Sequence, residues 1–248
     1  AISHLHGDHY LGLPGLIATF NLFGREKDLH IYGPPRLKEV LDLHQEVGEG
    51  WFDFRVHFHP TQTERAEVLF EDATVKLESF PVRHRIPTTG FLMREKEREP
   101  GIRKDWIRRW DLLPTEILCL KRGEDVQREN GDLISARRAC YPIPRPRSYA
   151  FAADTKYWAK IAESVSDVDL LYHEATFDDQ MKARAEKTFH STASQAARIA
   201  KEARVGRLVL GHLSARYASG DLHLKQAQEI FSETAMAKDG MVLSLDRL

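Results

Sequence analysis

Three histidines and an aspartate lie within six residues near the start of the chain, in the run His4-Leu5-His6-Gly7-Asp8-His9. A hydrophobic core could not satisfy so many polar rings and carboxylates. Imidazole and carboxylate groups are ligands that Zn²⁺ and similar divalent ions prefer in proteins. Four ligands could serve one ion, but the spacing favours two, because His4 and His6 can share one and leave Asp8 and His9 to a second. The run therefore predicts a site for divalent metal ions.

Two ions need more ligands than this run offers, and three further candidates lie where expected strands end. His84 follows a strand expected at 74–80, Asp154 ends the segment Tyr-Ala-Phe-Ala-Ala-Asp, and His212 ends Leu-Val-Leu-Gly-His. Open α/β sheets build their sites from polar residues just past the carboxyl ends of buried strands. Together with the first run, these residues form a coherent set of ligands.

The elements that must position this set alternate between short apolar runs and helical patterns, which predicts an α/β layered domain. We expect strands at 28–32, 55–59, 67–71, 74–80, 89–94, 148–153, 168–172, 207–211 and 241–245. We expect helices at 11–20, 35–47, 156–165, 192–203 and 224–235. Ser191 or Thr192 would cap the fourth helix.

The stretch from Leu92 to Arg147 has a different composition, with 14 Lys and Arg against 10 Asp and Glu. It contains an amphipathic segment with one apolar side, formed by Trp106, Ile107, Trp110 and Leu113. It ends in Tyr-Pro-Ile-Pro-Arg-Pro-Arg, which must be extended because residues before proline avoid the helical region. We interpret this stretch as a basic insertion, or arm, within a single domain covering 1–248.

The composition of the 248 residues is that of an ordinary globular chain, with 42 % hydrophobic residues and a formal net charge of −1. No run approaches the roughly 20 apolar residues that span a bilayer, so no membrane partner is expected. Two cysteines, Cys119 and Cys140, cannot build a disulfide framework, which favours a reducing compartment such as the cytoplasm. The near-neutral net charge of the whole chain is the sum of this basic stretch and an acidic remainder. It therefore does not exclude a nucleic-acid partner.

Several motifs resemble those of the metallo-β-lactamase fold hydrolases and, within them, the ribonuclease Z family. His-x-His-x-Asp-His alone identifies only the superfamily. More specific motifs are Tyr172-His-Glu-Ala-Thr-Phe177, His190-Ser-Thr192, Gly211-His-Leu-Ser-Ala-Arg-Tyr217, His84-Arg-Ile-Pro-Thr-Thr-Gly90 and Tyr32-Gly-Pro-Pro35. They occur in the right order from Ser3 to about Tyr217, so the resemblance covers nearly the whole chain.

The resemblance implies a metallo-β-lactamase-like αββα sandwich. Two strands and a glycine-rich turn that precede the first motif in this fold are absent, so we interpret the chain as N-terminally incomplete and missing the first strands. The arm also departs from the family pattern. Its tip corresponds to 112–116, which lacks the usual run of glycine and proline.

The resemblance also implies a set of ligands for two Zn²⁺ ions, although other divalent ions would also fit. His4, His6 and His84 would hold one ion. Asp8, His9 and His212 would hold the other, and Asp154 would bridge the two.

The mechanism implied by the resemblance is attack on a phosphodiester by a hydroxide held between the two ions. Asp8 would orient or deprotonate that water. His190, oriented by Glu174, would protonate the leaving 3′ oxygen, because a histidine polarised by a carboxylate is a good general acid near neutral pH. Residues that follow the last ligand would bind an adjacent phosphate, namely Ser214, Arg216 and Tyr217.

The expected function is therefore that of a zinc-dependent endoribonuclease that removes 3′ trailers from precursor tRNA, with a homodimer implied by the resemblance. One alternative is another hydrolase of the same fold, acting on a phosphodiester, sulfate ester or thioester. A second alternative is an inactive fragment that binds RNA. The combination of Glu174 and His190 with Ser191 and Thr192 favours the nuclease.

The remaining histidines are interpreted as structural. His57 and His59 are expected on a half-exposed strand face without partners nearby. His173 lies inside an apolar strand and is expected to be a core histidine rather than a ligand.

Overall fold

The computed structural model describes residues 1–48 and 52–245, and it divides into two compact units. The larger unit comprises Ala1–Arg94 and Arg147–Leu248, and the smaller comprises Glu95–Pro146. The smaller unit coincides closely with the basic stretch of the sequence. That it serves as an arm of a single functional domain remains a prediction.

The larger unit is built on a mixed seven-stranded sheet in the order β11-β10-β9-β8-β5-β4-β3. Strands β8 to β11 are parallel, whereas β5 runs antiparallel to β8 and β3 runs antiparallel to β4. The bounds are β3 (Glu67–Glu71), β4 (Val75–Pro81), β5 (Thr89–Glu95), β8 (Ser148–Ala152), β9 (Leu170–Glu174), β10 (Arg207–Gly211) and β11 (Thr234–Met236). The expected α/β class is correct.

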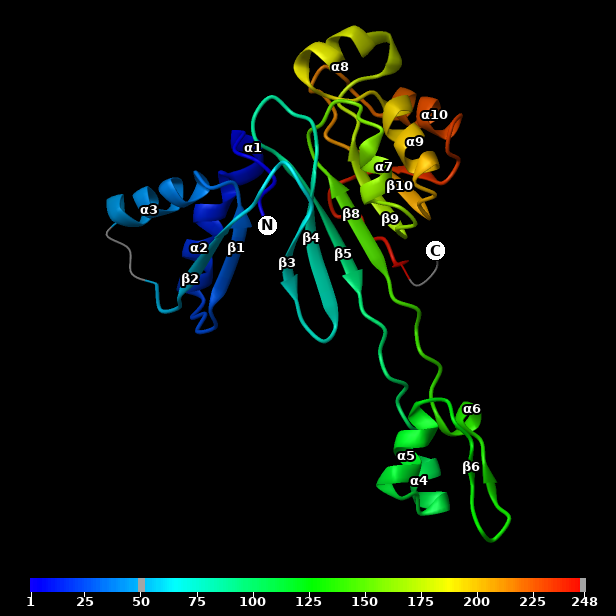
Figure 1. The fold of residues 1–248 in the computed structure, drawn as a ribbon. Coiled ribbons are helices and arrows are strands. Elements are labelled where there is room, and N and C mark those ends of the chain that lie inside the picture. The colour runs from blue at the N-terminus through cyan, green and yellow to red at the C-terminus, as the bar shows by residue number, and fades with distance from the viewer. Residues whose placement is uncertain (49–51, 246–248) are drawn as a thin grey trace. The chain divides into compact units, whose positions relative to one another are not determined.

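Helices α7 (Lys160–Ser164), α9 (Ala193–Glu202) and α10 (Asp221–Gln228) pack against this sheet (Figure 1). Helix α9 begins after Thr192, whose hydroxyl accepts a hydrogen bond from the amide of Gln195, so Thr192 is the cap. Its alanine-rich face permits close approach to the sheet. The core beneath these helices includes Phe80, Leu92, Leu171, Ile199 and Leu208. None of the helices within the described residues is both long and apolar enough to cross a membrane.

A two-stranded parallel sheet, β1 (Leu29–Gly33) with β2 (Val56–Pro60), carries the N-terminal helices (Figure 1). These are α1 (Gly7–Tyr10), α2 (Gly12–Leu22) and α3 (Leu37–Val47). Ile17, Ile31, Leu37 and Phe54 form a separate buried cluster. This cluster fixes α2 and α3 against β1, and so fixes the segment that follows the histidine run.

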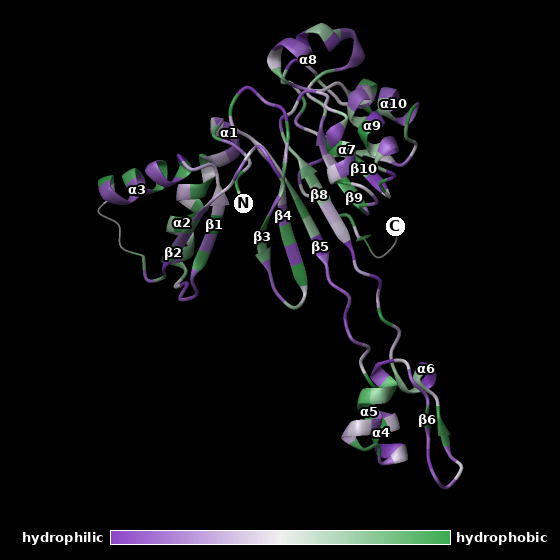
Figure 2. Cartoon of the chain, viewed as in Figure 1, coloured by the Kyte–Doolittle hydropathy of each residue, from purple (hydrophilic) through white to green (hydrophobic). Residues whose placement is uncertain are grey.

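Hydrophobic and hydrophilic residues alternate along the first part of β4, residues 75–78, and the strand ends with Phe80 and Pro81 (Figure 2). Phe80 belongs to the core beneath the helices, whereas Leu77 lines a cavity with Phe91 and Phe151. Both faces of this strand therefore carry apolar residues, and β4 ends at the loop that holds His84.

Three expected boundaries are wrong. The strand expected at 241–245 is absent, and the strand beside β10 is β11 instead, which overlaps the end of the segment assigned to a helix at 224–235. The side chains of Gln228 and Thr234 bond backbone carbonyls there and end the helix. The helix expected at 156–165 begins at Lys160, because the amide of Lys156 donates to the carbonyl of Arg83 (2.8 Å) and draws the chain away from a helix.

The smaller unit consists of α4 (Lys104–Trp110), α5 (Pro114–Lys121), β6 (Val126–Gln127), β7 (Leu133–Ile134) and α6 (Ala136–Ala139). Trp106, Ile107 and Trp110 pack around its buried core, as the amphipathic pattern predicts. Leu113 does not, because it lies beyond the end of α4, caps α5 and is 59 % exposed.

Candidate active site

The histidine run occupies an extended segment that passes into a helix. The amide of Ile2 donates to a carbonyl of β1 (2.8 Å), and the carbonyl of Ser3 accepts from the first amide of β5 (3.1 Å). His6 keeps an extended backbone at the N-cap of α1, whereas Asp8 and His9 belong to the helix itself. This change of backbone at His6 divides the run into two groups of ligands.

The first group gathers three imidazoles around one carboxylate. The Nδ1 atom of His6 lies 3.1 Å from Nε2 of His4 and 3.2 Å from Nε2 of His84. The Oδ2 atom of Asp154 lies 3.5 Å from His4 Nε2 and 3.7 Å from His84 Nε2. One ligand atom from each of the four residues lies within 4.8 Å of every other.

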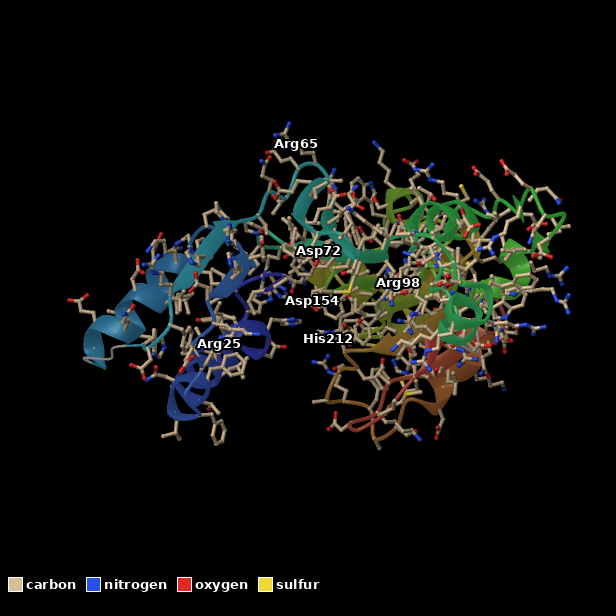
Figure 3. All side chains as sticks on the ribbon, turned by 90° about the horizontal axis from the view of Figure 1, so that it is seen from below. Arg25, Arg65, Asp72, Arg98, Asp154 and His212 are labelled. Carbon is tan, nitrogen blue, oxygen red and sulfur yellow. The ribbon has the colours of Figure 1, made fainter. Side chains whose placement is uncertain are left out.

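The second group faces the other oxygen of the same aspartate. Asp8 Oδ2 lies 3.4 Å from His9 Nε2 and 3.6 Å from His212 Nε2. Asp154 Oδ1 lies 3.3 Å from His212 Nε2 and 3.5 Å from His9 Nε2, and Figure 3 shows Asp154 and His212 together. Asp154 is therefore shared by the two groups, with one oxygen toward each.

His84 and His212 reach the site from loops at strand ends. His84 follows β4, and its Nδ1 atom donates to the carbonyl of Phe189 (2.9 Å), which leaves Nε2 to face the first group. His212 directly follows β10 and has a left-handed φ of 58°. A backbone conformation so costly for a residue other than glycine persists only where the surrounding structure holds it, and this one directs the ring at Asp8 and Asp154.

The electrostatics of the site favour the neutral ring in three of the histidines and the charged form of Asp154. Burial lowers the pKa of His84 to about 4, and burial also lowers the pKa of His6 and of His9. Burial opposes the charge of Asp154, but the hydrogen bond from His4 and the neighbouring rings of His212 and His9 hold its pKa below the usual range. Neutral imidazole and ionised carboxylate are the forms that bind a metal ion.

Glu174 and His190 form a pair beside these groups. Glu174 is fully buried at the end of β9, and its Oε1 atom lies 2.9 Å from His190 Nδ1. Burial disfavours the charged ring of His190, but the hydrogen bond and charge of Glu174 outweigh it and raise the pKa of His190. One nitrogen of His190 lies within 4.8 Å of ligand atoms of Asp154 and His212, so the ring reaches the metal-binding groups.

Thr176 connects this pair to the second group of ligands. Its hydroxyl donates to Glu174 Oε2 (2.7 Å) and lies 3.0 Å from His212 Nδ1 and 3.2 Å from His190 Nδ1. Thr176 is not among the site residues expected from the sequence, although the motif at 172–177 contains it. Its position two residues after Glu174 was the available signal.

The three residues proposed to bind an adjacent phosphate lie on the loop after His212. Arg216 is exposed, and Ser214 and Tyr217 are half-buried. The phenol oxygen of Tyr217 accepts a hydrogen bond from the amide of Asp178 (3.2 Å), and its ring packs against His223 with 4.5 Å between centroids. Tyr217 is thus held in place, whereas the guanidinium of Arg216 faces solvent.

The expectation that His57 and His59 lack partners is wrong. The Nε2 atom of His57 lies 2.8 Å from a carboxylate oxygen of Asp28, and the Nε2 atom of His59 lies 2.9 Å from His30 Nδ1. The rings stack because β1 and β2 pair in parallel register and place His30 directly beside His57. His173 is fully buried, as expected of a core histidine, with Nδ1 donating to the carbonyl of Glu174.

The residues present fit a metal centre on structural grounds. Asp154 Oδ1 and His9 Nε2 are buried and form no hydrogen bond within the part of the chain that the structure describes. Such atoms are costly to bury unless they bind something. Facing nitrogens and oxygens at 3.3 to 3.7 Å around Asp154 form a donor set that a divalent cation would satisfy.

Comparison with known sequences finds relatives that share the name ribonuclease Z. Ribonuclease Z of Bacteroides fragilis is 43 % identical over 244 residues, which are 98 % of this chain and 80 % of that protein. Ribonuclease Z of Cytophaga hutchinsonii is 41 % identical over 235 residues, which are 94 % of this chain and 75 % of that protein. No family model matches the chain.

Comparison with solved structures agrees with the fold. The short form of human tRNase Z is similar with a TM-score of 0.66 and 27 % identity, over 98 % of this chain and 77 % of that one. The metallo-β-lactamase fold protein YhfI of Bacillus subtilis is similar with a TM-score of 0.61 and 20 % identity, over 96 % of this chain and 74 % of that one. The expected metallo-β-lactamase-like fold is confirmed.

Proposed function

Because the chain belongs to the ribonuclease Z family, we propose that it removes 3′ trailers from precursor tRNA. It is a metal-dependent endoribonuclease that acts on tRNA and therefore a phosphodiester hydrolase. The observation that carries the finer proposal is the placement of Asp154 between two groups of ligands, with Glu174 and His190 alongside.

The proposed metal ligands are the members of the two groups described above. His4, His6 and His84 would hold one Zn²⁺ ion, and the three members of the second group, Asp8, His9 and His212, would hold another. Asp154 would contact both, because its two oxygens face different groups. Divalent cations bound there would lower the pKa of a water molecule and offset negative charge on the phosphodiester.

Two residues of the site would transfer protons, and a third would position one of them. Asp8 has a side chain that is 67 % exposed, so its carboxylate can accept a proton from the attacking water. His190 would donate a proton to the leaving 3′ oxygen from the nitrogen that Glu174 does not bind. Glu174 acts as a positioning residue, because it fixes the ring of His190 and raises its pKa.

Substrate contacts beyond the cleaved bond are proposed for two places. Ser214, Arg216 and Tyr217 lie on the loop that follows His212 and would bind a neighbouring phosphate. The smaller unit, Glu95–Pro146, would serve as an arm that contacts tRNA, because exposed arginines such as Arg108 and Arg109 lie on α4.

The proposal also includes a homodimer and a location in the cytoplasm. The homodimer rests on the family resemblance, and size-exclusion chromatography with light scattering would test it. Cys119 and Cys140 are both free thiols, which fits a reducing compartment.

The experiment that tests the function compares two substrates of the metal-loaded protein. We expect cleavage of a precursor tRNA at the 3′ side of the acceptor stem, with release of an intact trailer. Turnover of bis(p-nitrophenyl) phosphate without any processing of precursor tRNA would instead indicate another hydrolase of this fold. RNA binding without cleavage of either substrate would indicate an inactive binding protein.

A further inference from the structure

A polar pocket of about 490 Å³ lies between the loop after β4 and the segment before α7. Its walls include Arg83, His84, Arg85 and Trp158, and Glu64 contributes a carboxylate. His84 belongs to the first group of ligands as well, so one residue lines both the pocket and the metal-binding site. The proposed catalytic steps make no use of Arg83, Arg85 or Trp158.

Hydrogen bonds hold the two walls of this pocket together. The amide of Arg83 donates to the hydroxyl of Thr155 (3.0 Å), and the amide of Lys156 donates to the carbonyl of Arg83 (2.8 Å). Thr155 is fully buried and directly follows the shared ligand Asp154. The pocket is therefore built on the same backbone that positions the metal ligands, and its shape is largely preformed.

Arg83 and Trp158 form a flat surface within the pocket. The guanidinium carbon of Arg83 lies 4.4 Å from the centre of the Trp158 ring. Trp158 is half-buried against the main core, whereas Arg83 is exposed. Because the indole already orders the guanidinium, a ligand that stacks there loses little side-chain entropy on binding. Unpaired bases of RNA stack on arginine planes and aromatic rings in this way.

Arg85 links the pocket to the site of chemistry. Its Nη2 atom lies 3.3 Å from Nε2 of His6, on the side of that ring away from the other ligands of the first group. Arg85 is exposed and can therefore offer its remaining donors to a phosphate. Two guanidinium groups against the single carboxylate of Glu64 favour an anionic ligand.

We propose that this pocket binds one nucleotide of the RNA substrate next to the cleaved phosphodiester. Its base stacks on Arg83, which Trp158 supports from behind, and its phosphate contacts Arg85. The inference rests on the tRNA-cleaving function proposed above and adds a base-binding subsite to it.

Substitution of Trp158 tests the subsite. Trp158→Ala removes the support of the stacking surface, so it should lower kcat/KM for precursor tRNA by about 5- to 150-fold relative to kcat/KM for bis(p-nitrophenyl) phosphate, which has no base. We expect most of the loss in KM, and we expect Trp158→Phe to recover much of it. An equal loss on both substrates would mean that Trp158 only supports the fold, and would overturn the proposal.

Arg83→Ala and Arg65→Ala form a matched pair that separates stacking from charge. Arg65 follows Glu64 in the chain but does not line the pocket, and its side chain extends away from the labelled Asp154 (Figure 3). Arg83→Ala should reproduce the effect of Trp158→Ala, whereas Arg65→Ala should leave cleavage of precursor tRNA within about twofold of wild type. If the two variants lost equal amounts of activity on precursor tRNA, the effect would come from net charge alone. That result would overturn the proposed subsite.

A scan with abasic nucleotides gives the direct readout. The experiment uses a set of precursor tRNAs, each of which lacks one base near the cleavage site. The rate of cleavage of each is measured for wild type and for Trp158→Ala. At one position, removal of the base should slow wild type but not slow the variant further. If removal of the base at every position slows both proteins equally, no base depends on the stacked pair of Arg83 and Trp158, and the proposal is overturned. Failure of wild type to process any precursor tRNA would instead contradict the function itself, so the two failures are distinguishable.

Discussion

His190 Nδ1 lies 2.9 Å from Glu174 Oε1, although 16 residues separate them in the sequence. Glu174 ends β9, whereas His190 follows α8 (Lys182–Thr188) and a left-handed residue, Phe189, whose φ is 60°. The turn at Phe189 brings the ring back over the buried carboxylate. One nitrogen is thereby occupied, and the other remains for substrate.

Replacement of His190 by alanine should slow cleavage of precursor tRNA by about 10²- to 10⁴-fold, because the leaving oxygen loses its proton donor. The metal content, measured by elemental analysis of the purified protein, should stay that of wild type. His57→Ala on β2, outside both groups of ligands, is the matched control and should leave both quantities unchanged. Loss of metal from His190→Ala would show that the ring is a ligand instead.

The substitution Glu174→Gln should shift the descending limb of the pH profile of kcat toward lower pH. The carboxylate raises the pKa of His190, so the protonated donor persists to higher pH in wild type. Without that charge, the fall in rate with rising pH should begin at lower pH. A pH profile with an unchanged descending limb would contradict the role assigned to the pair.

Glu174→Gln should also destabilise the protein. Glu174 accepts hydrogen bonds from the amides of Thr155 (2.9 Å) and Thr176 (3.0 Å) in addition to the Thr176 hydroxyl. An amide group cannot accept from all these donors, and a buried donor left unpaired costs about 1–3 kcal/mol. Thermal unfolding followed by circular dichroism should show a lower midpoint, and an unaltered midpoint would argue against this network.

Asp154→Asn should weaken metal binding at both groups of ligands, because the two oxygens of Asp154 face different groups. A metal that binds the native state raises its free energy of unfolding. Added Zn²⁺ should therefore raise the unfolding midpoint of wild type and have a much smaller effect on Asp154→Asn. His57→Ala again serves as the control, and a response equal to that of wild type in Asp154→Asn would exclude the shared carboxylate.

The metal-free protein should lose stability as the pH falls from about 6.5 to about 4. Burial lowers the pKa of His84 to about 4, so in this range the unfolded chain binds a proton that the folded chain does not. His190 acts in the opposite sense because its pKa is raised. Comparison of wild type with His84→Gln in the presence of EDTA isolates the contribution of His84. Urea unfolding at several pH values should show that the free energy of unfolding depends less on pH in the variant than in wild type.

Replacement of both Arg108 and Arg109 by alanine should reduce the salt dependence of tRNA binding. For each phosphate that the variant no longer neutralises, the slope of log K against log salt should change by about 0.7 to 0.9. The pair Arg36→Ala and Lys38→Ala removes the same charge from exposed positions around α3 and is the control. An unchanged slope in the Arg108 and Arg109 variant would mean that the smaller unit does not bind the RNA.

The sequence by itself determined the class of fold and the membership of the ligand set. Alternating apolar residues predict β4, and the cap candidates Ser191 and Thr192 predict the start of α9, because both signals are local. The histidine run is likewise local, so His4, His6, Asp8 and His9 are visible without any structure. The end of α10 was wrong because Gln228 and Thr234 end it through side-chain contacts that no hydropathy pattern records.

Only the tertiary structure decided which of these residues meet. The order of strands in the sheet brings the ends of β4, β8 and β10 to one place, and with them His84, Asp154 and His212. The two oxygens of Asp154 and the stacking of Arg83 on Trp158 depend on distances between loops far apart in the chain. Such distances follow from packing across the sheet rather than from the spacing of residues along the chain. The sequence therefore could not show which of these residues lie close together.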